Sequence, residues 1–220
     1  MNKKETIAKI KEEAQEFFVG ASGCHDWTHV ERVRALALHI GKKEQADLFV
    51  LELAAFLHDI GRKEEMKCKG RLCHAEEGAK IARKILEKYG MEESQIENII
   101  HCIETHRWRK NNQPETLEAK IIFDADKLDS IGAIGIARDF LFAGGAGSNC
   151  LYTGNEKKLA KLNKDHSYTN EDSALLEYEI KLKYVKNKIA TKEGKRIAQE
   201  RHLYMKEFFA RFEQEIKGII

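Results

Sequence analysis

Apolar residues recur at helical spacing along most of this chain. Ile96, Ile99, Ile100 and Ile103 stand at positions i, i+3, i+4 and i+7, the stripe that one face of an α-helix buries. A second stripe, which stops at a glycine, comprises Ile81, Ala82, Ile85, Leu86 and Tyr89. The pattern therefore predicts amphipathic helices.

One run, residues 47–57 (DLFVLELAAFL), is apolar on nearly every side and predicts a buried helix. His58 and Asp59 follow it directly, and Gly61 is expected to end the helix just after them. A histidine and a carboxylate are costly to bury unless something binds them. A divalent metal ion is a natural partner for both groups.

The remaining pattern predicts an all-α fold. Residues 175–189 and 197–216 read as two further helices, and Pro114 suits the first turn of a helix leading to Ile121. Strand signals are nearly absent. We expect a helical bundle, with residues 1–155 as the domain that holds the predicted metal site between its helices. Residues 156–220 are expected to form a C-terminal helical extension that packs on the same domain.

Composition narrows the class of protein. The 220 residues are 42% hydrophobic and 34% charged, with a formal net charge of +2. This balance argues against an extended nucleic-acid partner or a membrane-surface protein. The chain has no apolar stretch of ~18 residues and no signal-peptide core at its start. We expect a cytoplasmic protein, and the oligomeric state is left open.

Two smaller features complete the pattern. The five cysteines are an odd number, and Cys68 and Cys73 have no second pair that would complete a zinc knuckle, so free thiols in a reducing compartment are expected. Residues 143–154 are glycine-rich but lack the ending and the preceding strand of a P-loop. They are interpreted as a flexible connection, with a phosphate cradle as the alternative, and such a loop could also form one lip of a pocket.

Further metal-binding residue types stand elsewhere in the chain. His29 opens a helix-periodic stretch, and Asp124 and Asp126 lie among apolar residues. Together with His58 and Asp59 they predict a metal site that processes phosphate. A set of two histidines and two or more carboxylates suits an octahedral Mn, Fe, Co, Ni or Mg ion better than structural zinc.

The order of these residues resembles a known family. A histidine, then His-Asp, then a distant Asp is the signature of the HD-domain metal-dependent phosphohydrolases, and the chain looks like the stand-alone bacterial predicted HD-superfamily hydrolases of that superfamily. The resemblance covers about residues 20 to 150. The matching runs are 29–33 (HVERV), 52–60 (ELAAFLHDI), 74–79 (HAEEGA) and 124–138 (DADKLDSIGAIGIAR).

By position, the resemblance implies the metal ligands His29, His58, Asp59 and Asp126. The last is preferred over Asp124 because the Ala-Asp-Lys-Leu run is the part that matches. Asp59 is expected to take the proton of the attacking water, as a ligand or from beside the ion. Asp124 is expected to orient a ligand, with a surface or capping acid as the alternative.

Three further histidines, His74, His101 and His106, lie between the His-Asp pair and the last aspartate. Some binuclear members of the family use extra histidines there. For His74 and His106 the leading interpretation is contact with substrate phosphate, and a second metal or a structural role remain alternatives. The doubled histidine and the Gly-Tyr-Pro segment of the cyclic-dinucleotide phosphodiesterases are missing, which argues against that substrate.

Basic residues near the motifs are candidates for holding substrate phosphates. Arg32 lies one helical turn after His29, and Lys127 follows Asp126 directly, so these two are favoured. Arg138 is read as an internal salt-bridge residue. Other nearby candidates are Arg62, Lys63, and Arg107 and Arg109, which flank Trp108, a side chain that could stack on a base.

His25 and Asp26 precede the first helix-periodic histidine. Asp26 is expected to be a helix N-cap, with His25 as a ligand contact the alternative.

Three functions are compatible with these residues. The leading one is a metal-dependent phosphohydrolase acting on a nucleotide, another small phosphate ester or a pyrophosphate. The alternative is a non-catalytic helical module that binds a metal and a nucleotide. A lesser alternative is a di-iron oxygenase on the same fold, which needs extra histidine ligands such as His74 and His101.

Overall fold

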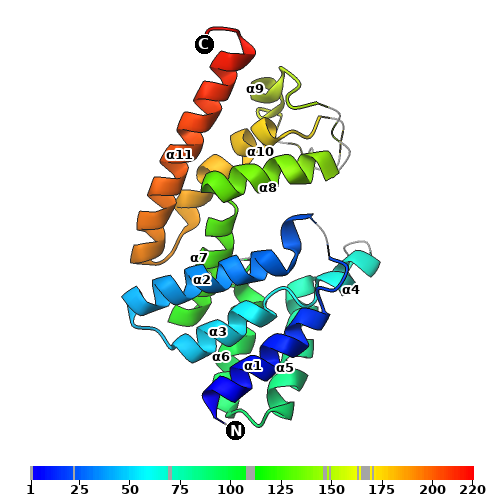
Figure 1. Cartoon of the computed structure of the whole chain (residues 1–220), viewed down its shortest axis with the longest axis vertical. Coiled ribbons are helices and arrows are strands. Elements are labelled where there is room, and N and C mark those ends of the chain that lie inside the picture. The colour runs from blue at the N-terminus through cyan, green and yellow to red at the C-terminus, as the bar shows by residue number, and fades with distance from the viewer. Residues whose placement is uncertain are drawn as a thin grey trace. The chain divides into compact units, whose positions relative to one another are not determined.

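The structure, a computed structural model, describes residues 2–21, 23–68, 71–107, 112–145, 148, 150–162, 164, 169 and 171–220. All the regular elements among these residues are helices (Figure 1), which confirms the predicted all-α fold. None of the described helices is both long enough and apolar enough to cross a bilayer.

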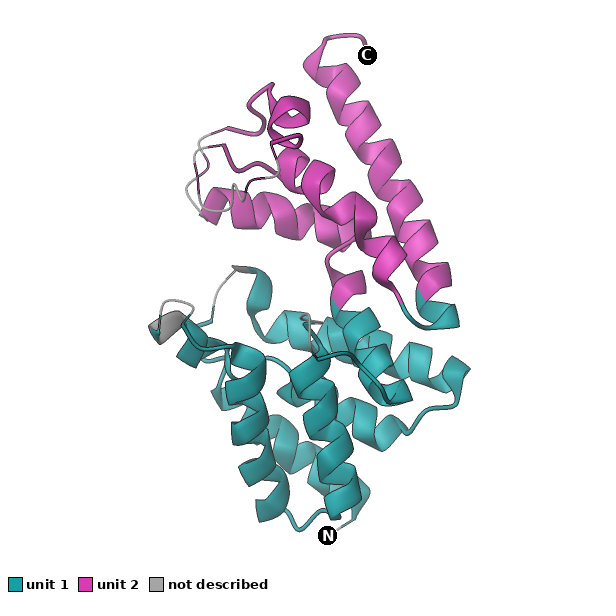
Figure 2. Cartoon of the chain, turned by 180° about the vertical axis from the view of Figure 1, so that it is seen from behind, with its two compact units in different colours: residues 1–126, 190–194 teal, residues 127–189, 195–220 magenta. Residues whose placement is uncertain are grey.

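Two compact units divide the chain (Figure 2). The first comprises Met1–Asp126 and Ala190–Gly194, and the second comprises Lys127–Ile189 and Lys195–Ile220. The units change after Asp126, Ile189 and Gly194, whereas the sequence suggested one boundary near residue 155. That boundary, and the packing of the C-terminal extension on the first domain, stay predictions.

The first unit is built around α3 (Leu48–Leu57). This helix packs against α1 (Lys3–Glu16), α2 (Trp27–Glu44) and α6 (Glu93–Thr105). Apart from Glu52, its side chains from Val50 onward are buried, which confirms the buried helix predicted from its apolar run. The other elements of this unit are η1 (Gly23–His25), α4 (Arg62–Lys67), α5 (His74–Lys88) and the first ten residues of α7 (Leu117–Asp129).

The buried helix ends earlier than Gly61, where the sequence suggested its end. Its last residue is Leu57, and His58 is its C-cap. Gly61 instead lies against the first turns of α5, where an added Cβ would overlap the carbonyl oxygen of His74 and the backbone of Gly78. Backbone therefore meets backbone at this point, and the turn that carries His58 and Asp59 is held against α5.

Helix α7 also begins later than its proline suggested. Pro114 lies before the helix, which starts at Leu117, so it is not in the first turn. The hydroxyl oxygen of Thr116 instead accepts a hydrogen bond from the backbone N–H of Ala119 (3.1 Å). Side-chain capping of this kind starts a helix without help from proline.

The second unit contains α8 (Gly132–Gly145), α9 (Glu156–Leu159), α10 (Ala174–Ile180), η2 (Leu182–Lys188) and most of α11 (Lys192–Ile216). The single helix expected over 175–189 is two elements, because Lys181 has φ −137°, outside the helical range. Leu182 and Val185 are both buried in η2. Residues three apart share one face of a 3₁₀-helix, so this tighter turn buries both.

Candidate metal centre

The four predicted metal ligands converge within the first unit. His29 lies in the first turn of α2, His58 and Asp59 follow α3, and Asp126 lies on α7. Nε2 of His29 is 3.3 Å from Nε2 of His58 and 3.5 Å from Oδ1 of Asp126. Oδ2 of Asp59 is 3.7 Å from Nε2 of His29 and 3.6 Å from Nε2 of His58. The histidines and Asp59 are fully buried at their side chains.

Local capping places the two histidines. Asp26 is the N-cap of α2, as expected, and its carboxylate accepts from the backbone N–H of His29 (3.2 Å). At the end of α3, Nδ1–H of His58 donates to the carbonyl oxygen of Ala55 (2.8 Å). Because a carbonyl can only accept, this bond leaves the lone pair of His58 on Nε2, toward Asp59.

A second pair of histidines faces the other oxygen of Asp59. His74 begins α5 and His106 is the C-cap of α6. Their Nε2 atoms are 3.2 Å apart, and they lie 3.3 Å and 3.5 Å respectively from Oδ1 of Asp59. Nδ1–H of His106 donates to the carbonyl oxygen of Ile103 (2.6 Å), and Nδ1–H of His74 donates to Glu65 (2.6 Å). Both Nε2 atoms therefore carry lone pairs.

These residues fit a divalent cation. Oδ1 of Asp59 is buried and has no hydrogen-bond partner among the described residues. Lone pairs of imidazole and carboxylate facing one another repel unless a cation lies between them. Ligand atoms about 2.1 Å from one ion lie about 3.0 Å apart at right angles and about 3.4 Å apart at a tetrahedral angle. The observed separations of 3.3 to 3.7 Å lie between the right-angle value and the roughly 4.2 Å of two donors on opposite sides of one ion.

Candidate ligand groups overlap at Asp59 and His29. His29, His58 and Asp126 form one group, and Asp59, His74 and His106 form another. A third group contains His25 with His29 and Asp59. The structure thus provides donors on both sides of the Asp59 carboxylate.

Electrostatics keep these donors in the form that binds a metal. Burial lowers the pKa of His58 to about 4 and also lowers the pKa of His106, so both are neutral at pH 7. Burial by itself acts to raise the pKa of Asp59, but the Arg62 guanidinium beside it holds that pKa well below its usual range. The carboxylate is therefore ionised.

Three contacts made by α4 go beyond what the sequence predicted. Nε of Arg62 donates to Oδ2 of Asp59, and Glu65 accepts from both His74 and Arg107 (3.0 Å to Nη1 of Arg107). The sequence motifs indicate Arg62 only as one of several nearby basic residues, and they do not indicate Glu65. Their spacing of three residues puts both on one face of a helix, but spacing alone does not show what that face contacts.

Other predicted residues have contacts outside this cluster. Nη1 of Arg32 donates to the hydroxyl of Thr28 (3.0 Å). Lys127 is half-buried on α7, in the part that belongs to the second unit. Nε2 of His101 accepts from the backbone N–H of Glu115 (2.9 Å). Arg138 pairs with Asp129, which confirms its expected salt bridge. Trp108 and Arg109 lie outside the described residues.

Asp124 accepts hydrogen bonds from the residues that precede α11. Its carboxylate accepts from the backbone N–H groups of Ala190 and Thr191 (2.8 Å each) and from the hydroxyl of Thr191 (2.6 Å). The hydroxyl oxygen of Thr191 in turn accepts from the N–H of Gly194 at the start of α11 (3.1 Å). Asp124 thereby ties α7 to the start of α11. Its expected role in orienting a ligand stays a prediction.

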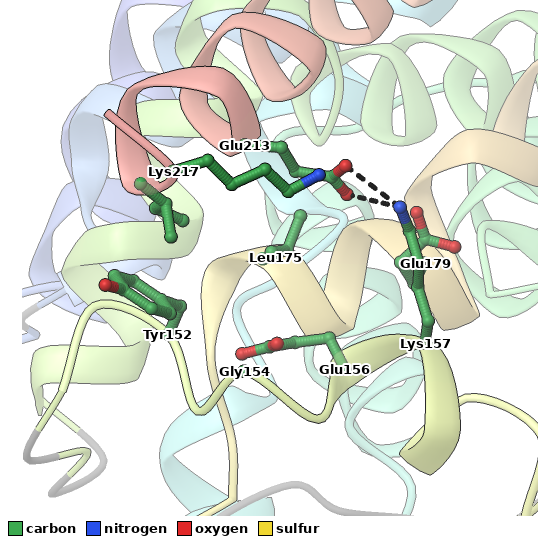
Figure 3. Close-up of a pocket in the computed structure, with 9 residues that line it drawn as sticks. Tyr152, Gly154, Glu156, Lys157, Leu175, Glu179, Glu213 and Lys217 are labelled. Carbon is green, nitrogen blue, oxygen red and sulfur yellow. Dashed lines mark hydrogen bonds and ion pairs between the residues drawn. The ribbon is translucent and has the colours of Figure 1, made fainter. Parts of the chain in front are cut away.

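The second unit has a cavity of its own, of about 270 Å³ (Figure 3). Charged side chains of α9, α10 and α11 surround an apolar floor, and Lys157 pairs with Glu213 across it (2.8 Å). Its lining is Tyr152, Gly154, Glu156, Lys157, Leu175, Glu179, Glu213, Ile216 and Lys217. None of the predicted site residues is among them.

Known proteins share the sequence pattern and the fold of this chain. The model of the HD domain matches residues 26–131. The uncharacterized protein YpgQ of Bacillus subtilis is 33% identical over 215 residues, which cover 96% of this chain and 94% of that protein. The chain therefore belongs to the HD-domain family.

Solved structures give the same result across the whole chain. The crystal structure of B. subtilis YpgQ in complex with ADP superposes with a TM-score of 0.76 at 31% identity, covering 100% of this chain and 99% of that one. An HD-superfamily hydrolase from Bacillus thuringiensis superposes with a TM-score of 0.74 at 29% identity, covering 98% and 99%. The particular relatives are thus stand-alone bacterial HD-superfamily proteins of similar length.

Proposed function

We propose that this chain is a metal-dependent phosphohydrolase whose substrate is a nucleotide or another small phosphate ester or pyrophosphate. The observation that carries the proposal is the Asp59 carboxylate, buried between two pairs of histidine Nε2 atoms. Burying these polar groups together costs free energy until a cation binds between them, so burial alone does not explain the arrangement.

The proposed ligands of the metal are His29, His58, Asp59 and Asp126. The ion is Mn, Fe, Co, Ni or Mg, since the donors are imidazole and carboxylate. When bound, such an ion activates water as a nucleophile and withdraws charge from a phosphoryl oxygen.

The chain's own residues supply the remaining steps. Asp59, kept ionised beside Arg62, accepts the proton of the attacking water. His74 and His106 contact the substrate phosphate, or hold a second ion together with Asp59. Arg32 and Lys127 neutralise phosphate charge, and Arg62 joins them because of its place beside Asp59.

A nucleotide is the favoured substrate class because B. subtilis YpgQ has been crystallised with ADP. The two chains align over nearly their full lengths, so a similar ligand is a reasonable expectation for this one.

The proposal is tested by loading the purified protein with Mn²⁺ and screening nucleoside mono-, di- and triphosphates and an aryl phosphate for release of phosphate or pyrophosphate. We expect turnover of at least one nucleotide and none with Asp59→Ala. Arg32→Ala or Lys127→Ala should raise KM or slow turnover while the metal stays bound. Tight nucleotide binding without hydrolysis would favour the non-catalytic module instead.

One observation keeps the oxygenase as a second candidate. His74 and His106 supply, beside Asp59, the extra histidines that a di-iron site requires. Oxygen consumption by the iron-loaded protein, with no phosphate released in the screen, would favour that function.

A further inference from the structure

His25 forms the solvent-facing side of the cluster. It ends η1 and immediately precedes Asp26, the N-cap that fixes the start of α2. Its side chain is 37% exposed, whereas the side chains of His29 and Asp59 are fully buried. A short, capped approach to the helix therefore places one imidazole at the edge of an otherwise buried site.

The ring of His25 is turned toward the proposed metal ligands. It packs edge-on against the ring of His29, with centroids 5.3 Å apart at 83°. Its Nδ1 lies 3.5 Å from Oδ2 of Asp59. His25, His29 and Asp59 each offer one donor atom, and these three atoms lie within 4.8 Å of one another.

Nδ1 of His25 has no hydrogen-bond partner although it is buried. The 3.5 Å to Asp59 exceeds the length of a normal N–H···O bond. Since the nitrogen itself is buried, the exposed part of the side chain is the rest of the ring, where water can satisfy Nε2. An orphaned inward-facing nitrogen costs free energy, and a cation shared with Asp59 would remove that cost.

Separations of 3.5 Å from His25 and 3.7 Å from His29 to the same Asp59 oxygen fit a common ion. Donor atoms about 2.1 Å from one ion lie between about 3.0 Å and about 4.2 Å apart, depending on the angle between them. The arrangement thus resembles the spacing of the other donor pairs in the cluster.

We propose that His25 is a further ligand of the metal ion, bound through Nδ1. This inference rests on the proposed function, because the ion is the one that His29, His58, Asp59 and Asp126 hold. A third imidazole gives the ion a nitrogen-rich set. Mg²⁺ prefers oxygen ligands, so His25 shifts the metal preference toward Mn²⁺, Fe²⁺, Co²⁺ and Ni²⁺.

The test counts histidine ligands in the full-length protein. Pulsed electron paramagnetic resonance of the Mn²⁺ form reports the imidazole nitrogens coupled to the ion. We expect three coupled imidazoles in the wild type and two in His25→Ala. His39→Ala is the matched control, because His39 is exposed and pairs with Glu193 (2.9 Å) on another part of the unit.

Metal affinity supplies a second readout. His25→Ala should raise the Kd for Co²⁺ at least about tenfold and change the visible Co²⁺ spectrum, and His25→Gln should behave alike. The Kd for Mg²⁺ should change much less.

Two results would overturn the inference, and they have different consequences for the proposed function. Two coupled imidazoles in a wild type that hydrolyses its substrate would remove His25 alone and leave the phosphohydrolase standing. A wild type that takes up no divalent ion would remove both. The wild-type count needs no substitution, so poor folding of a variant leaves the test intact.

Discussion

At the scale of single residues, Asp59 has its two carboxylate oxygens turned to different partners. Oδ2 faces Arg62, His29 and His58, and Oδ1 faces the second histidine pair. A carboxylate arranged in this way can serve ions or ligands on both of its sides at once. Removing any one donor should therefore weaken metal binding without destroying the whole arrangement.

We predict that His58→Ala and Asp126→Ala will each lower the metal content of the purified protein. Each removes a proposed donor, and the loss of affinity should be at least about tenfold. Elemental analysis after dialysis measures it, with His101→Ala as the control because His101 bonds to Glu115 away from the cluster. Metal content equal to wild type in both variants would contradict the ligand assignment.

A second residue-scale prediction concerns Asp139 on α8. Burial raises its pKa to about 8, with Glu177 and Asp172 adding to the effect, and its Oδ2 has no hydrogen-bond partner among the described residues. The folded state holds this proton up to a higher pH than the unfolded state does. The free energy of unfolding therefore falls as the pH rises from about 4 to about 8.

Asp139→Asn should therefore raise stability less at pH 5 than at pH 9, and the two gains should differ by an amount on the order of a few kcal/mol. Urea unfolding of both proteins at the two pH values measures the difference. A gain of equal size at pH 5 and pH 9 would show that Asp139 does not titrate as described.

Part of the site could be predicted from the sequence because some of its residues stand next to the segment that buries them. His58 and Asp59 end an apolar run, so their burial and their need for a partner could be read directly. Glu65 could not be found in this way. It belongs to a short polar helix whose placement against His74 depends on the tertiary approach at Gly61.

At the scale of elements, the hydrogen bonds between α7 and the start of α11 join parts of the first unit that lie far apart in the sequence. Asp124 and Thr191 lie 67 positions apart and are joined by two hydrogen bonds. Apolar periodicity predicted α3 and α11 well, because a buried stripe repeats over several turns. It could not show which polar residue holds one helix to another.

We predict that Asp124→Asn lowers the free energy of unfolding by about 2–4 kcal/mol, because a buried charged acceptor loses its bonds to N–H and O–H donors. If Asp124 also orients the metal ligands through α7, metal affinity or rate should fall by roughly 10- to 100-fold without loss of binding. Chemical denaturation and metal titration measure the two effects.

Thr191→Val is the matched variant for this prediction, since it removes one partner and keeps the acid. Both variants should then change the metal Kd in the same direction. A metal Kd equal to wild type in both would limit Asp124 to a structural role.

At the scale of the whole molecule, every proposed metal ligand lies in the first of the two units. The fold class could be predicted because nearly all segments share one periodicity. The division into units could not, since it depends on residues 190–194 returning to the first unit after a long excursion.

The metal should accordingly stabilise the protein through that unit. At a free concentration of 100 times Kd, a bound ion adds about 2.7 kcal/mol to the free energy of unfolding. This corresponds to a rise of about 5–10 °C in the Tm of the unfolding transition in which the ion is released. Differential scanning calorimetry with and without Mn²⁺ measures this shift. His58→Ala should lose most of it, and an equal shift in that variant would place the stabilising ion elsewhere.

The ion pair between Arg62 and Asp59 has a consequence for how the protein is made. The chain itself supplies a permanent positive charge beside the buried Asp59 carboxylate, so it can reach its folded form before any metal arrives. Under the proposed function, maturation would be the binding of a metal ion to a site that has already folded, and metal starvation would leave a folded, inactive protein instead of a misfolded one.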